Sequence, residues 1–256
     1  MKFSDILSGV NGKLKVLPIL HTCDAYGFRS ILDSKELQPQ RCDVFDKDYL
    51  YAYYGVPSYR IKTNAATNNL SLFPVCCILD YEKVDNLIKI YPFDTGAFMK
   101  MDEIKKQHFH PKMKLENFEL IPNIKNAVRV VEKFYKTNLN YIKKRVQIKS
   151  ENLDPVNFEA HSYFSLITDG ALSKTDDRVS TIELIFNNAI TLSKDTLINI
   201  ILPSSFMDDK KISKTIRDDF NISSPFVYHT VKGDPQEYFG LIYNTYLSFV
   251  ERNNYI

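Results

Sequence analysis

Residues 178–186 read RVSTIELIF, a run rich in β-branched and aliphatic side chains with one carboxylate in its middle. This composition is typical of a β-strand. Alternate side chains of a strand point to opposite faces, so Ile182, Leu184 and Phe186 share one face and Glu183 lies on the other. A carboxylate inside an apolar strand is unfavourable unless it is paired or borders a wet cleft. Glu183 therefore marks either a functional cleft or an exposed strand face, and this segment leaves both interpretations open.

A second segment, residues 50–60, reads LYAYYGVPSYR and places tyrosines on both sides of a Gly-x-Pro turn. A tyrosine can stack on a heteroaromatic ring while its hydroxyl bonds the ring edge, and an arginine can hold a phosphate through its planar guanidinium. The alternative is an aromatic core cluster with the arginine in an internal ion pair. That alternative is weaker, because each buried hydroxyl needs a partner. The candidate ligand-binding residues here are Tyr51, Tyr53, Tyr54, Tyr59 and Arg60.

A third segment, residues 14–22, reads LKVLPILHT and predicts a strand that ends in His21 and Thr22. Such a strand would bring an imidazole and a hydroxyl to one end of a sheet. The other interpretation is a histidine that is hydrogen-bonded within a loop. Pro18 lies inside the run and favours an edge strand or a bulge, since proline cannot donate to a strand ladder.

The remaining pattern mixes strands and helices. Further strands are predicted at 49–54, 73–80, 87–93, 180–186, 197–202 and 225–231. Helices are predicted at 24–34 (with Asp24 as N-cap), 123–146, 209–220 and 236–251. Strands cluster toward both ends of the chain and a helical stretch interrupts them. This order favours an α+β class over alternating βαβ units.

The 256 residues are 44% apolar and 25% charged, a composition that excludes a disordered, collagen-like or coiled-coil chain. With only 8 Gly, a fold built on repeated glycine-rich phosphate loops is not expected. No linker or repeat divides the chain, so we expect one domain over 1–256. We find no apolar run long enough for a membrane helix and no signal-peptide core, so we expect a cytoplasmic protein without membrane contact. The adjacent Cys76 and Cys77 lie in an apolar run and are expected to be buried.

Positive charge is concentrated in one part of the chain. Residues 100–149 hold 13 Lys and Arg against 5 Asp and Glu, whereas the whole chain has a net charge of +2. We interpret the segment around 100–150 as a basic helical insertion. Basic side chains at steps of three or four form a stripe on its predicted helix, which could follow a nucleic-acid backbone or could be an ordinary solvated face. The basic stripe consists of Lys125, Arg129, Lys133 and Lys136.

Taken in chain order, the three segments resemble the ADP-ribosyltransferase superfamily. The resemblance is to its His-Tyr-Glu branch, which includes DNA-modifying toxins and tRNA phosphotransferase-like proteins, and it covers only the surroundings of the three motifs. The spacing from His21-Thr22 through Ser30-Ile31-Leu32 to Leu37-x-Pro39 is similar to the opening of that fold. The tyrosine block is longer than the usual motif, which leaves open which tyrosine stacks. The matching positions are His21 with Thr22, one or more of Tyr51, Tyr53 and Tyr54, and Glu183.

This resemblance implies a split β-sheet core with flanking helices and an enzyme that cleaves NAD at the nicotinamide–ribose bond. The ADP-ribose would pass to a macromolecule. Glu183 would stabilise the positive charge that develops on the ribose, His21 would hold a ribose hydroxyl, and a tyrosine would stack on nicotinamide. NAD is then a substrate, and no metal is expected. The basic stripe favours DNA or RNA as acceptor, and analogy alone suggests a toxin or phage-defence role with a neutralising partner protein.

Other functions stay open. Water can replace the macromolecule, which would make the protein a plain NAD glycohydrolase. The same cleft without catalysis would be a nucleotide- or nucleic-acid-binding module, and a protein whose tyrosines are all core would be an interaction protein. The orientation of Glu183 relative to His21 and the tyrosines distinguishes catalysis from binding.

Two weaker candidates lie between the motifs. His108 and His110 would share a face on a strand, but no acidic or cysteine partner follows at ligand spacing, so we expect no metal site. Asp94-Thr95-Gly96 follows a predicted strand and is typical of a turn, or of a loop over the site. The sequence contains no glycine-rich dinucleotide fingerprint and no Gly-Lys-Ser/Thr phosphate loop.

Overall fold

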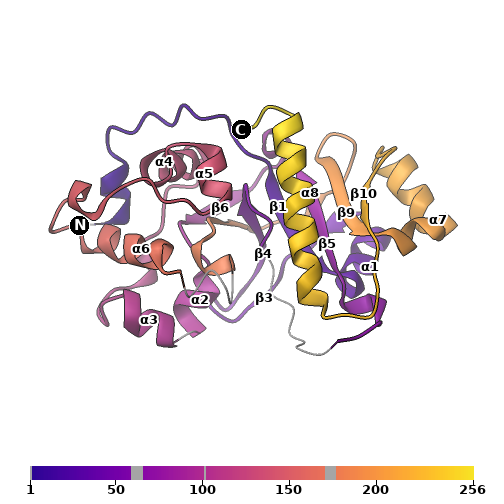
Figure 1. The fold of residues 1–256 in the computed structure, drawn as a ribbon, viewed down its shortest axis with the longest axis horizontal. Helices are drawn as coiled ribbons and strands as arrows, with labels where there is room; N and C mark the ends of the chain where they lie inside the picture. Colours follow the sequence, from indigo (N-terminus) through magenta and orange to yellow (C-terminus); the bar gives the residue numbers. More distant parts are fainter. Residues whose placement is uncertain (1, 59–65, 101, 171–176) are drawn as a thin grey trace.

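A β-sheet crosses the middle of the molecule, and helices pack around it (Figure 1). The computed structural model describes residues 2–58, 66–100, 102–170 and 177–256. The strands are β1 (Ile19–Asp24), β2 (Glu36–Leu37), β3 (Gln40–Cys42), β4 (Lys47–Tyr54), β5 (Pro74–Leu79), β6 (Leu87–Tyr91), β7 (Glu183–Phe186), β8 (Ile190–Thr191), β9 (Leu197–Pro203) and β10 (Phe226–Tyr228). The α-helices are α1 (Ala25–Ser34), α2 (Thr95–Lys100), α3 (Asp102–His108), α4 (Ile124–Phe134), α5 (Asn138–Ile142), α6 (Phe158–Thr168), α7 (Lys210–Lys214) and α8 (Phe239–Arg252).

The main sheet has the order β10-β9-β5-β1-β4-β7-β6, and β3 pairs with β4 beside this path. Neighbouring strands are antiparallel except β9 and β10, which are parallel. The short strands β2 and β8 form a separate antiparallel pair. A mostly antiparallel sheet with helices around it is the α+β class that the sequence predicts.

One edge of β4 changes its partner along its length. Its last two residues, Tyr53 and Tyr54, pair with β1, whereas residues 47–49 pair with β3. From His21 onward, β1 pairs with β5 alone. The sheet therefore divides beside the middle of β4 into the halves β10-β9-β5-β1 and β4-β7-β6. We call this place the fork.

The first strand and helix form nearly where they were predicted. Asp24 accepts a hydrogen bond from the amide of Gly27 at 2.8 Å and so caps α1, as expected. The predicted strand 14–22 begins only at Ile19, and β1 is a central strand rather than the edge strand that Pro18 favoured. Both differences have one cause: Pro18 lies just before β1, so its missing N–H falls outside the ladder.

The predicted long helix over 123–146 is wrong: the segment forms two helices, α4 and α5. Lys136 adopts a φ of 67°, a left-handed conformation that ends a right-handed helix. Thr137 then caps α5 by accepting a hydrogen bond from the amide of Asn140 at 3.1 Å. As a result, the basic stripe runs past the end of α4.

Four predicted strands, 49–54, 73–80, 87–93 and 197–202, are confirmed as β4, β5, β6 and β9. Four other predictions need new bounds. The strand predicted at 180–186 begins at Glu183, because Asp177–Ser180 forms a 3₁₀ turn. The strand predicted at 225–231 is shorter than expected, because β10 covers only Phe226–Tyr228. The helix predicted at 209–220 is α7 followed by a π-helical turn, and the helix at 236–251 is a 3₁₀ turn followed by α8.

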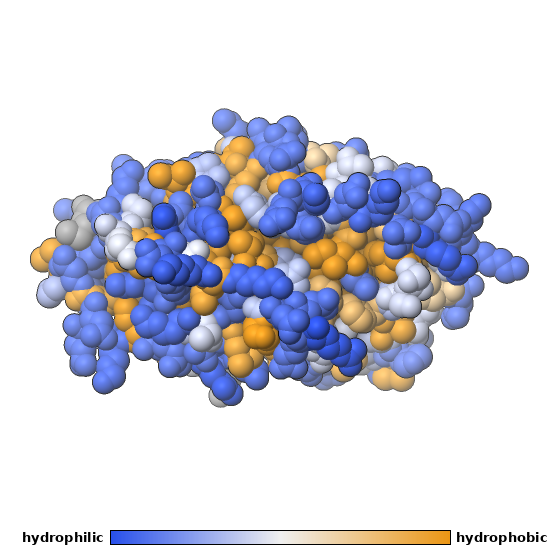
Figure 2. All heavy atoms as spheres, turned by 90° about the horizontal axis from the view of Figure 1, so that it is seen from above, coloured by the Kyte–Doolittle hydropathy of each residue, from blue (hydrophilic) through white to orange (hydrophobic). Residues whose placement is uncertain are grey.

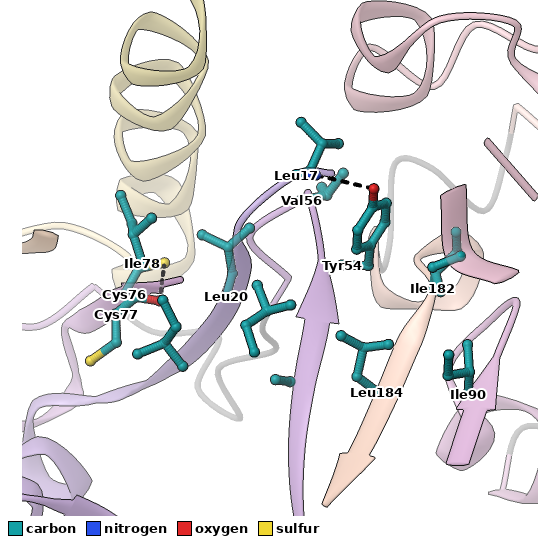
Figure 3. Close-up of a cluster of buried hydrophobic side chains, with 14 of the residues drawn as sticks. Leu17, Leu20, Tyr54, Val56, Cys76, Cys77, Ile78, Ile90, Ile182 and Leu184 are labelled. Carbon is teal, nitrogen blue, oxygen red and sulfur yellow. Dashed lines mark hydrogen bonds between the residues drawn. The ribbon is translucent and has the colours of Figure 1, made fainter. Parts of the chain in front are cut away.

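The core extends from Phe3 to Val250 as one cluster of buried hydrophobic side chains. Cys76 and Cys77 are fully buried within it, as expected. Figure 3 shows their side chains on opposite sides of β5. Burial raises the pKa of the Cys76 thiol to about 12, so this thiol stays protonated and unreactive.

Hydrophilic side chains cover much of the face seen in Figure 2, with hydrophobic atoms showing between them. Several large hydrophobic side chains are exposed at separate positions in the chain, including Tyr26, Ile121 and Val231. Among the described residues, no helix has both the length and the apolar character that a bilayer span requires.

Candidate functional site

Glu183 is held in place at the start of β7. Its side chain is buried, and its Oε2 accepts two hydrogen bonds from Thr95, one from the amide at 3.2 Å and one from the hydroxyl at 2.7 Å. Glu183 lies directly opposite Tyr53 in the antiparallel ladder, so the two side chains share a face of the sheet. The carboxylate is thus directed toward β4 and the first turn of α2 and is not on an exposed strand face.

A second buried carboxylate lies beside Glu183. Asp94 accepts a hydrogen bond from the Tyr53 hydroxyl at 2.6 Å. Burial raises the pKa of Glu183 well above its usual value, and the neighbouring charge of Asp94 raises it further. The hydrogen bonds from Thr95 oppose this rise in the pKa, because they stabilise the ionised form. Burial and Asp94 therefore disfavour the ionised form of Glu183, and Thr95 favours it.

His21 lies at the fork. Its Nδ1 is 2.9 Å from the main-chain oxygen of Tyr51, in the stretch of β4 between the partners β3 and β1. A carbonyl only accepts hydrogen bonds, so Nδ1 carries the hydrogen and Nε2 has the lone pair. Burial lowers the pKa of His21 and the bond to Tyr51 partly opposes this, so the ring is neutral at neutral pH.

The tyrosines divide between the two faces of β4. Tyr51 and Tyr53 are half-buried, and the Tyr51 hydroxyl donates to the sulfur of Cys42. Burial, the bond to Cys42 and the charge of Glu183 all raise the pKa of Tyr51. Tyr54 is fully buried, and Figure 3 shows its hydroxyl directed at the amide of Leu17, 3.1 Å away. Tyr54 is therefore part of the core and lies outside the candidate site.

The other predicted ligand-binding residues are not in this group. Thr22 is buried and pairs with Cys76 in the ladder, so its side chain is on the opposite face of β1 from that of His21. Tyr59 and Arg60 lie outside the described residues. The structure thus brings Glu183 and Tyr53 together directly and connects His21 to them through the backbone of β4.

Three residues that act on Glu183 or Tyr53 were not predicted as site residues: Asp94, Thr95 and Arg178. The sequence indicates a turn, or a loop over the site, at Asp94-Thr95-Gly96, and it indicates no role for Arg178. Arg178 lowers the pKa of Tyr53, while burial, the largest cause, and Asp94 raise it. The available signal was a short polar sequence, Asp94-Thr95-Gly96, directly after a buried strand end.

The basic stripe lies apart from this group. Lys125 is exposed, as is Lys136 beyond the end of α4, while Arg129 and Lys133 are half-buried. Figure 1 shows α4 and α5 at the top of the molecule and α2 and α3 at the bottom. α2 begins at Thr95, the residue that holds Glu183, so the stripe and Glu183 belong to different groups of helices in this view.

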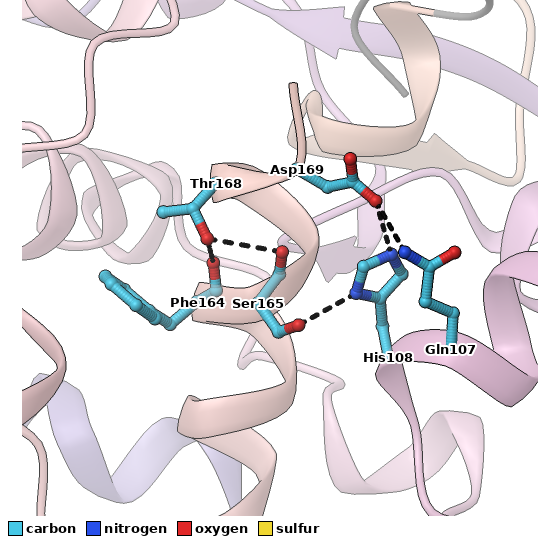
Figure 4. Close-up of polar contacts among 6 residues, drawn as sticks. All are labelled: Gln107, His108, Phe164, Ser165, Thr168 and Asp169. Carbon is cyan, nitrogen blue, oxygen red and sulfur yellow. Dashed lines mark hydrogen bonds and ion pairs between the residues drawn. The ribbon is translucent and has the colours of Figure 1, made fainter. Parts of the chain in front are cut away.

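His108 belongs to a separate polar cluster (Figure 4). Its Nδ1 is 2.9 Å from the Ser165 hydroxyl, and its Nε2 is 3.2 Å from the carboxylate of Asp169. These contacts fasten α3 to α6. The expectation that His108 and His110 share a strand face is wrong, because His108 ends a helix and His110 is exposed beyond it. Within the part of the chain that the structure describes, no three His, Cys, Asp or Glu side chains form a metal site.

No protein-family model and no curated protein sequence matches the chain. Among solved structures, the chain is similar to DarT of Thermus sp. 2.9 in complex with NAD+, with 11% sequence identity and a TM-score of 0.41. The match covers 83% of this chain and 94% of that chain. At this level of similarity, the candidate site is defined by the residues of this chain.

Proposed function

We propose that the protein is an ADP-ribosyltransferase-like enzyme that cleaves NAD at the bond between nicotinamide and ribose. The observation that supports it best is Glu183, a buried carboxylate that Thr95 holds opposite Tyr53. A carboxylate in this position is unfavourable for folding, and a catalytic role accounts for it. The other two motifs meet the same strand, since His21 bonds to Tyr51.

Each of these groups has a task in the proposed reaction. The bond between C1′ and the nicotinamide nitrogen breaks, its electrons leave with neutral nicotinamide, and an acceptor attacks the cationic ribose at C1′. Ionised Glu183 stabilises that cation. Nε2 of His21 accepts a hydrogen bond from a ribose hydroxyl. The half-buried rings of Tyr51 and Tyr53 offer stacking surfaces for nicotinamide.

The acceptor in this proposal is a macromolecule, and the positive charge around α4 favours DNA or RNA. Because the basic stripe lies apart from Glu183, it would hold a polymer at a distance from the reacting atoms. A toxin or phage-defence role in the cytoplasm, with a neutralising partner protein, follows by analogy only. Hydrolysis of NAD, with water as acceptor, is the nearest alternative.

The test is to incubate the purified protein with NAD labelled in its adenylate phosphate, with and without DNA, RNA and lysate protein. We expect release of nicotinamide and label on one polymer. Glu183→Gln lowers nicotinamide release by about 10²-fold or more, whereas Glu251→Gln, at an exposed position, leaves it unchanged. Nicotinamide without labelled polymer identifies a glycohydrolase. Binding of NAD without release of nicotinamide contradicts the proposal and identifies a binding module.

The basic stripe is tested separately. Replacing Lys125 and Lys133 together by glutamine should weaken polymer labelling and reduce its sensitivity to salt, because fewer phosphates are neutralised. Nicotinamide release without polymer should not change. Lys210→Gln, on exposed α7, is the matched control. If the wild type, the double variant and the control label the polymer equally, the basic stripe does not take part in acceptor binding.

A further inference from the structure

The turn between β6 and α2 holds two side chains of the candidate site at once. Asp94 accepts a hydrogen bond from the amide of Ala97 at 2.7 Å through Oδ1, and one from the Tyr53 hydroxyl at 2.6 Å through Oδ2. The next residue, Thr95, donates both of its hydrogen bonds to Oε2 of Glu183. Among the described residues, the hydrogen bonds to Glu183 all reach Oε2, and none reaches Oε1.

Both turn residues are almost fully buried, with Asp94 4% and Thr95 1% exposed. Burial strengthens electrostatic interactions, so a charge or a hydroxyl in this turn acts strongly on a neighbouring carboxylate. A surface loop that merely connected a strand to a helix would not require a buried acid next to another buried acid.

We propose that Asp94 and Thr95 are positioning residues that set the orientation of Glu183 and act on its charge in opposite directions. Asp94 places a like charge beside Glu183 and disfavours its ionisation, whereas Thr95 donates two hydrogen bonds to the ionised form and fixes its rotation. This inference rests on the proposed function, because it explains how Glu183 is prepared for NAD cleavage.

The groups that surround Glu183 come from every neighbouring element. They are Tyr51 and Tyr53 of β4, Cys42 of β3, Tyr91 of β6, and Asp94 and Thr95 of the turn, with Arg178 acting on Tyr53. Asp94 has the largest effect of a neighbouring charge on Glu183, and Thr95 supplies its hydrogen bonds. The turn is therefore the place where a substitution changes the charge of Glu183 most directly.

Two substitutions separate the two effects. NAD cleavage that requires ionised Glu183 slows as the pH falls through the pKa of that residue. Asp94→Asn removes the like charge and keeps the shape of the turn, so the acidic limb of the rate profile moves to lower pH. Thr95→Val removes the hydroxyl and keeps the amide donor, so the limb moves to higher pH. Damage to the fold would not produce opposite shifts.

The experiment measures kcat for nicotinamide release against pH in the wild type, D94N and T95V. We expect shifts of about one pH unit in opposite directions. Thr168→Val, at an exposed position of α6, is the control and should show no shift. A second readout follows the carboxyl carbons of ¹³C-labelled glutamate by NMR, with the Glu183 signal assigned by its absence in E183Q.

The outcomes distinguish the inference from the proposed function. Shifts in the same direction, or no shifts, in a protein that releases nicotinamide overturn the roles of Asp94 and Thr95. If the wild type releases no nicotinamide but the NMR titration of Glu183 still moves in opposite directions, the proposed function fails and the electrostatic setting of Glu183 by the turn is supported. An unmoved NMR titration in both variants overturns the inference whatever the activity.

Discussion

His21 donates a hydrogen bond from Nδ1 to the main-chain oxygen of Tyr51, 2.9 Å away, where β1 separates from β4. At this point neither β1 nor β3 pairs with β4. The imidazole therefore replaces a strand as the partner of a backbone carbonyl, which would otherwise lack one. The same bond fixes the ring orientation and leaves Nε2 for a further partner.

This relationship predicts that His21→Ala weakens NAD binding by about tenfold, the value of a typical hydrogen bond. The rate of nicotinamide release should fall as well. Isothermal titration with NAD measures the affinity, and His229→Ala, at an exposed position just after the edge strand β10, is the control. If His21→Ala binds NAD with the affinity of the wild type, His21 does not contribute to NAD binding.

Glu183→Gln should stabilise the protein while it abolishes activity. Folding raises the pKa of Glu183 above its unfolded value of 4.5, so its contribution to stability is present below pH 4.5 and is lost as the pH rises through the folded pKa. Glutamine still offers an oxygen to Thr95 and carries no charge. We expect a gain of about 1–3 kcal/mol at pH 8 and a smaller gain at pH 5. Urea denaturation at both pH values measures this difference, and a variant less stable than the wild type at pH 8 would contradict it.

Tyr53 and Tyr54 are adjacent but should respond differently to the loss of a hydroxyl. Tyr54→Phe leaves the buried amide of Leu17 without its acceptor, which costs about 1–3 kcal/mol of stability. Nicotinamide release at a temperature where the variant is folded should not change. Tyr53→Phe removes the donor to Asp94, and we expect slower release with a smaller loss of stability, since Tyr53 is half-buried. Chemical denaturation and activity measured together test this, and the reverse pattern would place Tyr54 in the site.

The cluster around His108 should give the protein a pH-dependent stability. Burial lowers the pKa of His108 below 6.5, and Asp169 only partly opposes this. The stability from neutral His108 is therefore present above pH 6.5 and is lost as the pH falls through the folded pKa. His108→Gln should cost about 1–2 kcal/mol at pH 7.5, and the difference from the wild type should narrow at pH 5. Thermal unfolding at pH 7.5 and pH 5 measures the stability difference between the wild type and this variant. A difference that is the same at both pH values would contradict the prediction.

Much of the sheet could be predicted from the sequence, because strands buried on a face have a simple period of two. The sequence also identified Glu183 as a carboxylate inside an apolar strand, and the structure shows that this side chain is buried. The break between α4 and α5 could not be predicted, since Lys136 adopts its left-handed backbone in a segment whose apolar spacing continues without interruption. Helix α6 was missed because FEAHSYFSLIT has apolar residues around much of its circumference and shows no clean stripe.

The candidate site was predicted less completely than the sheet. Motifs identify residues of unusual chemistry, but they do not show which of them meet. Tyr53 and Tyr54 are neighbours in the sequence, and only the register with β1 and β7 shows that one faces Glu183 and the other faces the core. The sequence around Asp94 and Thr95 indicates only a turn or a loop over the site, and their role depends on contacts with residues 41 and 88 positions away.

The 88-residue separation between Thr95 and Glu183 has a consequence for synthesis in the cell. While a ribosome is still translating the codons before β7, the emerging polypeptide already contains His21, the tyrosines and the turn that will grip the carboxylate, but not the carboxylate itself. Translation must pass about residue 183 and then thread that strand between β4 and β6. A chain that ends before β7 therefore lacks the carboxylate that the proposed reaction requires.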